Sequence, residues 1–315
     1  MTVPLGELLA GLGLPEPPTP LPAPATDSHT HFDATAERSG LAPEDALAAA
    51  AAVGVTRFVQ VGCDAADSAW AVQFAARQPA VVAAVALHPN EVARHPERLA
   101  EGLAAIGRLA AAGPHVRAIG ETGLDYFRTT DPAGQARQRD AFAAHIELAA
   151  ACGLALVIHD RDAHADVLDV LAGSARPDRV VMHCFSGDAD HARRCVARGD
   201  WLSFPGVITY KANAFLREAL AVTPPEQLLV ETDAPYLTPV PARGRPNSPY
   251  LLPHTVRCIA QLRGWDLAWT ARLLADNATA AFGGPWGDDT TADTGGHAPT
   301  SEGCHSSADA TAGPR

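Results

Sequence analysis

The chain carries a His-x-His pair, His29 and His31, with the acidic residues Asp27 and Asp33 close on either side. If this stretch is a β-strand, both imidazoles point to the same face, because side chains alternate in direction along a strand. Two imidazoles side by side are a common means for a short segment to bind a transition metal. The pair alone is a weak indication, so its weight depends on whether other ligands join it.

Four further side chains that can bind a metal each follow an apolar run. They are Glu121, His159, His183 and Asp233. If the runs are strands of a parallel barrel, their carboxyl ends converge at one mouth, where such barrels build their active sites. One catalytic zinc typically uses three protein ligands, so four imidazoles and two carboxylates suit two ions that share a bridging carboxylate. Each residue alone is more often a cap or a satisfied polar group, but the six together favour a metal centre.

The apolar runs alternate with stretches that are rich in Ala, Leu and Arg. Strands are predicted near Asp27 and at 55–61, 81–87, 116–120, 154–158, 179–182, 201–204 and 228–230. Helices are predicted at 43–53, 65–77, 97–112, 133–152, 162–172, 188–198, 212–221 and 250–263, with a last one at 266–282. Eight strand–helix units imply parallel pairing and predict an α/β fold, a single (β/α)8 TIM barrel with an extra C-terminal helix. A doubly wound open sheet is the alternative, but no Gly-x-Gly-x-x-Gly follows any predicted strand.

Composition divides the chain into three parts. Residues 1–24 form a proline-rich leader that we expect to be flexible, and residues 25–282 form the barrel. Residues 283–315 form a low-complexity acidic tail. We expect this tail to be disordered, because it has almost no large apolar side chains to bury.

The net charge of −12 argues against a broad basic face that grips nucleic acid. A nucleic acid would therefore be held locally, by a few arginines and by metal ions. The six cysteines form no Cys-x-x-Cys pair and indicate reduced thiols, which predicts a cytoplasmic protein. No run of about 18 uncharged apolar residues predicts a membrane span, so we expect no association with a membrane.

Five motifs match those of one family. They are 27–33 (Asp-Ser-His-Thr-His-Phe-Asp), 87–89 (Leu-His-Pro), 119–126 (Ile-Gly-Glu-Thr-Gly-Leu-Asp-Tyr), 183–187 (His-Cys-Phe-Ser-Gly) and 231–237 (Glu-Thr-Asp-Ala-Pro-Tyr-Leu). In these motifs the chain resembles the TatD family of metal-dependent hydrolases, which are amidohydrolase-like barrels. The resemblance spans about residues 25–282, and the segments 160–164, in which Arg161 still matches, and 206–213 depart modestly from the family's pattern.

The resemblance implies a set of ligands for two divalent metal ions. One ion would be held by His29, His31 and Asp233. The second would be held by His159 and His183, with Glu121 bridging the two. The ions would be Mg²⁺, Mn²⁺ or Zn²⁺: nitrogen-rich ligation suits Zn²⁺ or Mn²⁺ better, whereas nucleases of the family are often described as Mg²⁺-dependent.

The resemblance also implies the chemistry. Members of the family are associated with DNA hydrolysis, including 3′-to-5′ exonuclease action on single strands, and some remove D-amino acids from tRNA. Paired divalent ions would attract a phosphodiester and lower the pKa of a bound water. Asp233 is the expected general base, and Glu121 is the second catalytic carboxylate.

Six other side chains are expected to contact the substrate. They are His88, Tyr126, Arg128, Arg161, Tyr236 and Arg243. The arginines suit bidentate contacts to phosphate, and the tyrosines suit stacking on a base. Surface roles for the arginines, buttressing by the tyrosines and a turn at His88 are the alternatives. His145 and His191 are expected at the surface or on helices, and Cys184 is expected to point into the packing.

We therefore expect a metal-dependent deoxyribonuclease, a 3′–5′ exonuclease on single-stranded DNA. The first alternative is a D-aminoacyl-tRNA deacylase, or another ester or amide hydrolase that uses the same site. The second is a non-catalytic nucleic-acid-binding or scaffold protein on a degenerate barrel, against which the complete ligand set argues. The sequence predicts no oligomeric state.

Overall fold

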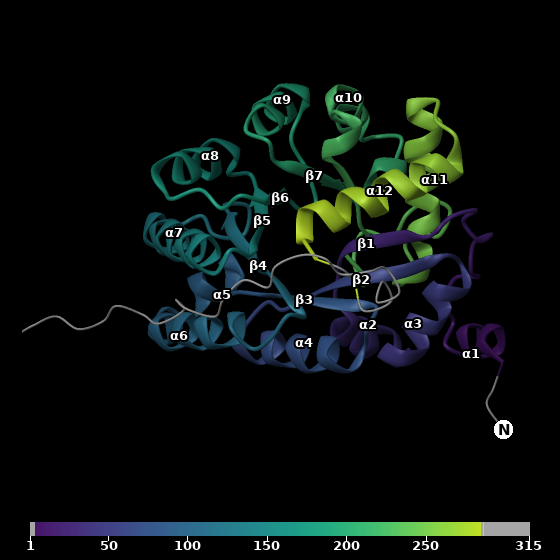
Figure 1. The fold of residues 1–315 in the computed structure, drawn as a ribbon, viewed down its shortest axis with the longest axis horizontal. Helices are drawn as coiled ribbons and strands as arrows, with labels where there is room; N and C mark the ends of the chain where they lie inside the picture. Colours follow the sequence, from purple (N-terminus) through teal and green to yellow (C-terminus); the bar gives the residue numbers. More distant parts are fainter. Residues whose placement is uncertain (1–3, 285, 287–315) are drawn as a thin grey trace, which may run out of the picture.

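Eight parallel strands, surrounded by helices, form the centre of the computed structural model, which describes residues 4–284 and residue 286 (Figure 1). The strands are β1 (Ala25–Thr30), β2 (Val55–Val61), β3 (Val81–Val85), β4 (Val116–Asp125), β5 (Ala155–Arg161), β6 (Val180–Met182), β7 (Trp201–Phe204) and β8 (Leu228–Val230). They pair in sequence order from β1 to β8. The chain after β8 then returns to β1, where the backbone N–H of Asp233 donates to the carbonyl of His29 at 3.0 Å. The predicted TIM barrel is confirmed, and the open-sheet alternative is wrong.

Helices cover the outside of the barrel (Figure 1). They are α1 (Leu5–Gly11), α2 (Phe32–Ser39), α3 (Pro43–Ala52), α4 (Ala65–Arg77), α5 (Pro89–Arg94), α6 (Leu99–Ala110), α7 (Pro132–Cys152), α8 (His164–Gly173), α9 (Ala189–Ala197), α10 (Ala214–Val222), α11 (Leu252–Arg263) and α12 (Leu267–Phe282). The sequence did not predict α1, α2 or α5, which are short, but it did predict the last helix. Among the described helices, none is long and apolar enough to cross a membrane.

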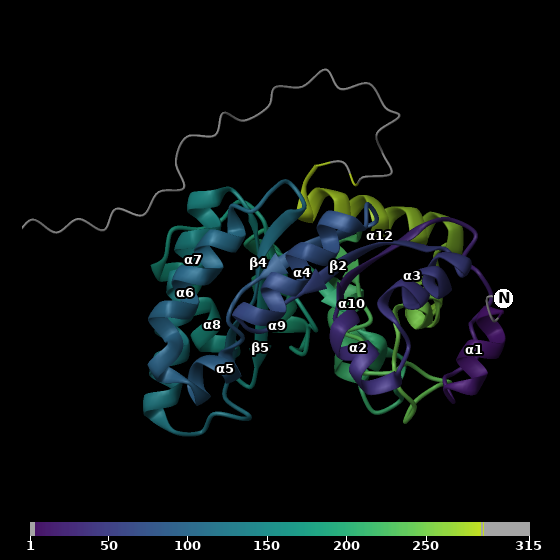
Figure 2. The same cartoon turned by 90° about the horizontal axis from the view of Figure 1, so that it is seen from below.

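Small and branched side chains fill the inside of the barrel. Val82, Ala118 and Val157 belong to one buried cluster, which also contains Phe282 from α12. Helix α12 lies across one end of the barrel (Figure 2). Because that end is closed by apolar packing, the open mouth is the one at the carboxyl ends of the strands.

Strands β4 and β5 run past their predicted ends. They continue to Asp125 and Arg161, so Glu121 and His159 lie within strands and not directly after them. At Gly123, where φ is 137°, an added Cβ would lie 2.1 Å from the carbonyl oxygen of His159. Glycine is therefore required where the two strands approach closely. The prediction ended β4 too early because glycines usually weaken a strand interior.

The leader packs against the barrel, and its predicted flexibility does not match this packing. Leu9 and Leu14 are only 1% and 4% exposed. The hydroxyl of Tyr250 donates to the carbonyl of Pro15 at 2.8 Å. The prediction rested on the prolines and overlooked the spaced leucines, whose burial anchors the segment.

The predicted disordered tail lies outside the described residues, except for residues 283, 284 and 286. Trp286 is 1% exposed and belongs to the apolar cluster inside the barrel. The predicted barrel boundary at residue 282 therefore falls within packed structure.

Replacing Leu9 with alanine is expected to lower the free energy of unfolding by about 2–5 kcal/mol, the usual range for a buried leucine. Urea unfolding of the full chain measures this change. Glu7→Ala, at an exposed position of the same helix, is the control and should change the free energy by less than about 0.5 kcal/mol. Equal stability of Leu9→Ala and the unaltered chain would mean that the leader adds nothing to stability.

Candidate metal centre

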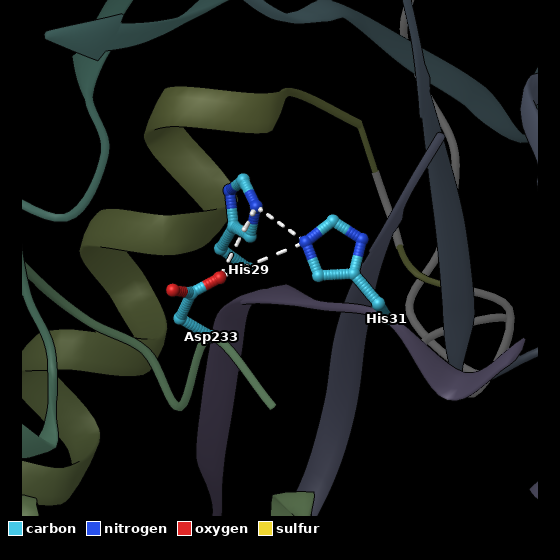
Figure 3. A group of neighbouring side chains, drawn as sticks. All are labelled: His29, His31 and Asp233. Atoms are coloured by element: carbon cyan, nitrogen blue, oxygen red, sulfur yellow. Dashed lines mark hydrogen bonds and ion pairs between the residues drawn. The ribbon is translucent and has the colours of Figure 1, made fainter. Parts of the chain in front are cut away.

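Three predicted ligands meet where β1 lies beside the segment after β8 (Figure 3). His29 Nε2 lies 3.2 Å from His31 Nε2. Asp233 Oδ1 lies 3.9 Å from the His29 nitrogen and 3.6 Å from the His31 nitrogen. Donor atoms bound to one ion at about 2.1 Å lie roughly 3–4 Å apart, so this trio can hold a cation.

The carboxylate of Glu121 lies between this trio and a second pair of imidazoles. Its Oε1 is 2.5 Å from His159 Nδ1 and 3.1 Å from His183 Nε2. Its Oε2 is 3.5 Å from His29 Nε2. The structure therefore brings all six predicted ligands together, and one carboxylate faces both groups.

The outer nitrogens of two of these imidazoles face hydrogen-bond acceptors. His31 Nδ1 lies 2.9 Å from the carbonyl oxygen of Val61, and His183 Nδ1 lies 3.0 Å from Glu231 Oε1. An acceptor at one ring nitrogen fixes the proton there and leaves a lone pair on the other nitrogen. These lone pairs face carboxylates at the centre, and two electron-rich groups repel each other. The arrangement is therefore favourable only when a cation, either a proton or a metal ion, lies between them. The residues present therefore fit divalent cations.

Protons can occupy the place of a metal at this centre. Burial alone would lower the pKa of His159, but hydrogen bonds to Asp125 and Glu121 outweigh it and raise that pKa to about 9. Burial would raise the pKa of Glu121, yet the imidazoles of His183 and His88 hold it well below its usual range. Protons and metal ions therefore compete for the same groups.

A buried carboxylate behind the centre, Asp27, connects β1 to the segment that carries Asp233. It accepts hydrogen bonds from Thr232 N at 2.9 Å and from Thr232 Oγ1 at 2.5 Å. Burial raises the pKa of Asp27 to about 8 in spite of these hydrogen bonds. Because Thr232 directly precedes Asp233, Asp27 helps to position that ligand.

Three carboxylates that support the centre were not predicted to do so. They are Asp27, Asp125 and Glu231. Asp125 Oδ2 lies 3.3 Å from His159 Nε2, and Glu231 contacts His183 as described above. Asp27 and Asp125 stand two and four positions from a predicted ligand in the same strand, so strand alternation was the signal that could have identified them, whereas Glu231 lies just beyond the end of β8.

A cavity of about 730 Å³ opens at the centre. Four predicted substrate contacts line it, namely His88, Arg128, Arg161 and Tyr236. Arg243 does not line the cavity, but its guanidinium carbon lies 4.3 Å from the ring centroid of Tyr210, which does. Tyr126 points elsewhere, and its hydroxyl donates to Asp166 Oδ2 at 2.7 Å. Tyr126 points away because the preceding side chain, Asp125, points into the centre, and its contact with Asp166 fits the buttressing alternative.

The expectation for Cys184 is also corrected, whereas His145 and His191 lie on helices, as one of their two expected placements had it. Cys184 lines the cavity, because it lies beyond the end of β6, where strand alternation no longer applies, and has a φ of 46°. His145 lies on α7 as a fully buried residue and accepts a hydrogen bond from Leu87 N at 3.2 Å. His191 lies on α9 and is also buried, at 6% exposure.

Comparison with known proteins agrees with this geometry. Residues 26–283 match the family model described as TatD related DNase. An uncharacterized metal-dependent hydrolase TatD of Mycobacterium tuberculosis is 44% identical over 262 residues, which cover 82% of this chain and 98% of the relative. A 3′-5′ ssDNA/RNA exonuclease TatD of Cronobacter sakazakii is 36% identical, and the match covers 76% of this chain and 91% of the relative.

Comparison of the fold with solved structures points to the same family. The crystal structure of YJJV, a TatD homologue from Escherichia coli K12, superposes with a TM-score of 0.76 at 29% sequence identity. The match covers 83% of this chain and 98% of that one. Together with the gathered imidazoles and carboxylates, these findings show that the chain belongs to the TatD family of metal-dependent hydrolases.

Proposed function

We propose that this hydrolase is a deoxyribonuclease that removes nucleotides from the 3′ end of single-stranded DNA with two divalent ions. The observation that supports this most is the Glu121 carboxylate, whose two oxygens face both groups of imidazoles. A carboxylate shared in this way suits two ions about 3.5–4 Å apart, the arrangement used in two-metal cleavage of phosphodiesters. The exonuclease name of the Cronobacter relative supports the same substrate class.

In this proposal six side chains hold the two ions. One ion is assigned to His29, His31 and Asp233. The other is assigned to His159 and His183, and Glu121 would be shared by both. The bound ions would lower the pKa of an attacking water and stabilise negative charge on the phosphate. Nitrogen-rich ligation favours Zn²⁺ or Mn²⁺ over Mg²⁺ at these positions.

Asp233 is assigned the role of accepting the proton from the attacking water. Its side chain is 14% exposed and lines the cavity, whereas the side chain of Glu121 is 5% exposed. Burial would raise the pKa of Asp233, but its hydrogen bond with His31 and the charge of His183 keep that pKa below its usual value. Asp233 is therefore ionised at neutral pH and free to act as a base.

Exposed aromatic and basic side chains around the cavity favour a polynucleotide over a small ester. Tyr236 is 48% exposed and Phe215 is 41% exposed, and both line the cavity. The guanidinium carbon of Arg161 lies 4.0 Å from the ring centroid of Phe127, which is 58% exposed. Bases of a single strand stack on such rings, and arginines bind the phosphates between them.

Replacing Asp233 with asparagine is expected to lower kcat on single-stranded DNA by about 10²–10⁴-fold, because an amide cannot accept the proton. Release of nucleotides from a 5′-labelled strand, with Mg²⁺ or Mn²⁺ present, measures the effect. Asp169→Asn, at an exposed position on α8, is the matched control and should keep the full rate.

The same assay separates the alternatives. An unchanged rate in Asp233→Asn would contradict the role given to this residue. Mischarged D-aminoacyl-tRNA and a simple carboxyl ester are run beside the DNA. Hydrolysis of either one, with none of DNA, would favour a deacylase or another ester hydrolase. Inactivity on all three substrates with metal bound would favour a scaffold protein.

Replacing Arg161 with alanine is expected to lower kcat/KM on single-stranded DNA by about 10–100-fold, because a hydrogen bond to a charged group contributes about 1.5–3 kcal/mol. The loss should appear mainly in KM. In a plot of log affinity against log salt concentration, the slope should become shallower by about 0.7 for each phosphate contact that is removed. Arg193→Ala, which removes an exposed ion pair with Asp190, is the control. An unchanged KM would remove Arg161 from the proposed phosphate contacts.

Removing divalent ions with EDTA is expected to abolish hydrolysis and to lower the unfolding temperature. The reason is that carboxylates and imidazole lone pairs at the centre lose the cation they share. Calorimetry gives the temperature, and elemental analysis confirms that the ions are gone. Added Mn²⁺ or Zn²⁺ should restore both properties, and full activity of the metal-free protein would contradict the proposal.

A further inference from the structure

A second cluster of metal-binding side chains lies beside the centre, where β5, α8 and α9 come together. Its members are Asp160, His164 and His191. Asp160 follows the proposed ligand His159 in β5, His164 begins α8, and His191 lies in α9. The three are not used by the proposed reaction, yet their donor atoms all lie within 4.8 Å of one another.

The distances in this cluster suit a single ion. Asp160 Oδ2 lies 2.8 Å from His164 Nδ1 and 3.4 Å from His191 Nε2. Around a tetrahedral ion with bonds of about 2.0–2.2 Å, the ligand atoms are roughly 3.3–3.5 Å apart. The two imidazoles stack with centroids 4.4 Å apart and an interplanar angle of 20°, and each presents a nitrogen to the same carboxylate oxygen. Of the two pairs that involve Asp160, the shorter would have to open by a few tenths of an ångström.

A hydrogen-bonded cluster without an ion is the alternative, and one observation disfavours it. The Asp160 side chain is 5% exposed, and its Oδ1 is buried with no hydrogen-bond partner among the described residues. A structural network would be expected to use both oxygens, because an unpaired buried oxygen is costly. Cys195 Sγ lies within hydrogen-bonding distance of His191 Nε2, at 3.6 Å, so a sulfur atom also borders the imidazole nitrogen that faces Asp160.

We propose that Asp160, His164 and His191 bind one further divalent cation of the zinc type. Imidazoles and a carboxylate with a thiol beside them favour Zn²⁺ or Co²⁺ over Mg²⁺ or Ca²⁺. The ion connects β5 to α8 and α9. Ser186 Oγ donates to the carbonyl of Asp160 at 3.1 Å and joins the segment after β6 to the same point. The role that follows is structural, since the ion fixes the end of β5 where Arg161 enters the cavity.

The zinc content of the full chain tests this proposal. After loading with Zn²⁺ and dialysis, His164→Gln and His191→Gln are each expected to contain one ion fewer per chain than the unaltered protein by elemental analysis. His254→Gln, which changes a partly buried histidine of α11, is the control and should lose none. Equal zinc content in the unaltered protein and both cluster variants overturns the proposal.

Thermal unfolding gives a second readout that does not depend on activity. The His164 side chain is 35% exposed, so its replacement by glutamine should leave folding intact. Added Zn²⁺ is expected to raise the unfolding temperature of His254→Gln by more than that of His164→Gln, because only the control keeps the cluster. An equal rise in the two variants overturns the proposal. The six proposed ligands of the other centre are the same in both variants. Whether or not that centre binds metal, it affects both unfolding temperatures equally and does not alter the comparison.

Discussion

A buried carboxylate surrounded by imidazoles is the interaction on which this site depends. Glu121 is 4% exposed and lies in β4, while the imidazoles around it come from β1, from β5 and from the segments that follow β1, β3 and β6. Such a group is stable away from water only when protons or metal ions share its charge. The barrel provides this environment, because its apolar interior lies below the mouth and its strands deliver their donors to one place. The apolar runs that fold the chain thus also decide where the donors meet.

The close approach of β4 and β5 is the constraint that completes the arrangement. A Cβ on Gly120 would lie 2.5 Å from the Cβ of Val157, so a larger residue would push the strands apart. With glycine there, Glu121 reaches His159 from one side. Because β4 continues beyond Glu121, Asp125 reaches the same imidazole from the other side. The support of His159 from both sides therefore depends on how closely β4 packs against β5.

The parts of this structure that could be predicted depend on local pattern, and the parts that could not depend on contacts between distant segments. Apolar runs and the spacing of His29 and His31 were sufficient for the barrel and for the meeting of the six proposed ligands. The true ends of β4 and β5 depend on how closely two strands pack, which no single segment reveals. The direction of Cys184 depends on where β6 stops. The packing of the leader depends on Tyr250, which is far away in the sequence.

The segments outside the family match supply part of the buried apolar surface. Leu9 and Leu14 precede the matched range and Trp286 follows it, and all three are at most 4% exposed. A shortened protein trimmed to the limits of that match would uncover hydrophobic area both where the leader packs and at the closed end of the barrel. Such a fragment would be prone to aggregate. The folded unit of this protein therefore includes residues on both sides of the range that matches the family.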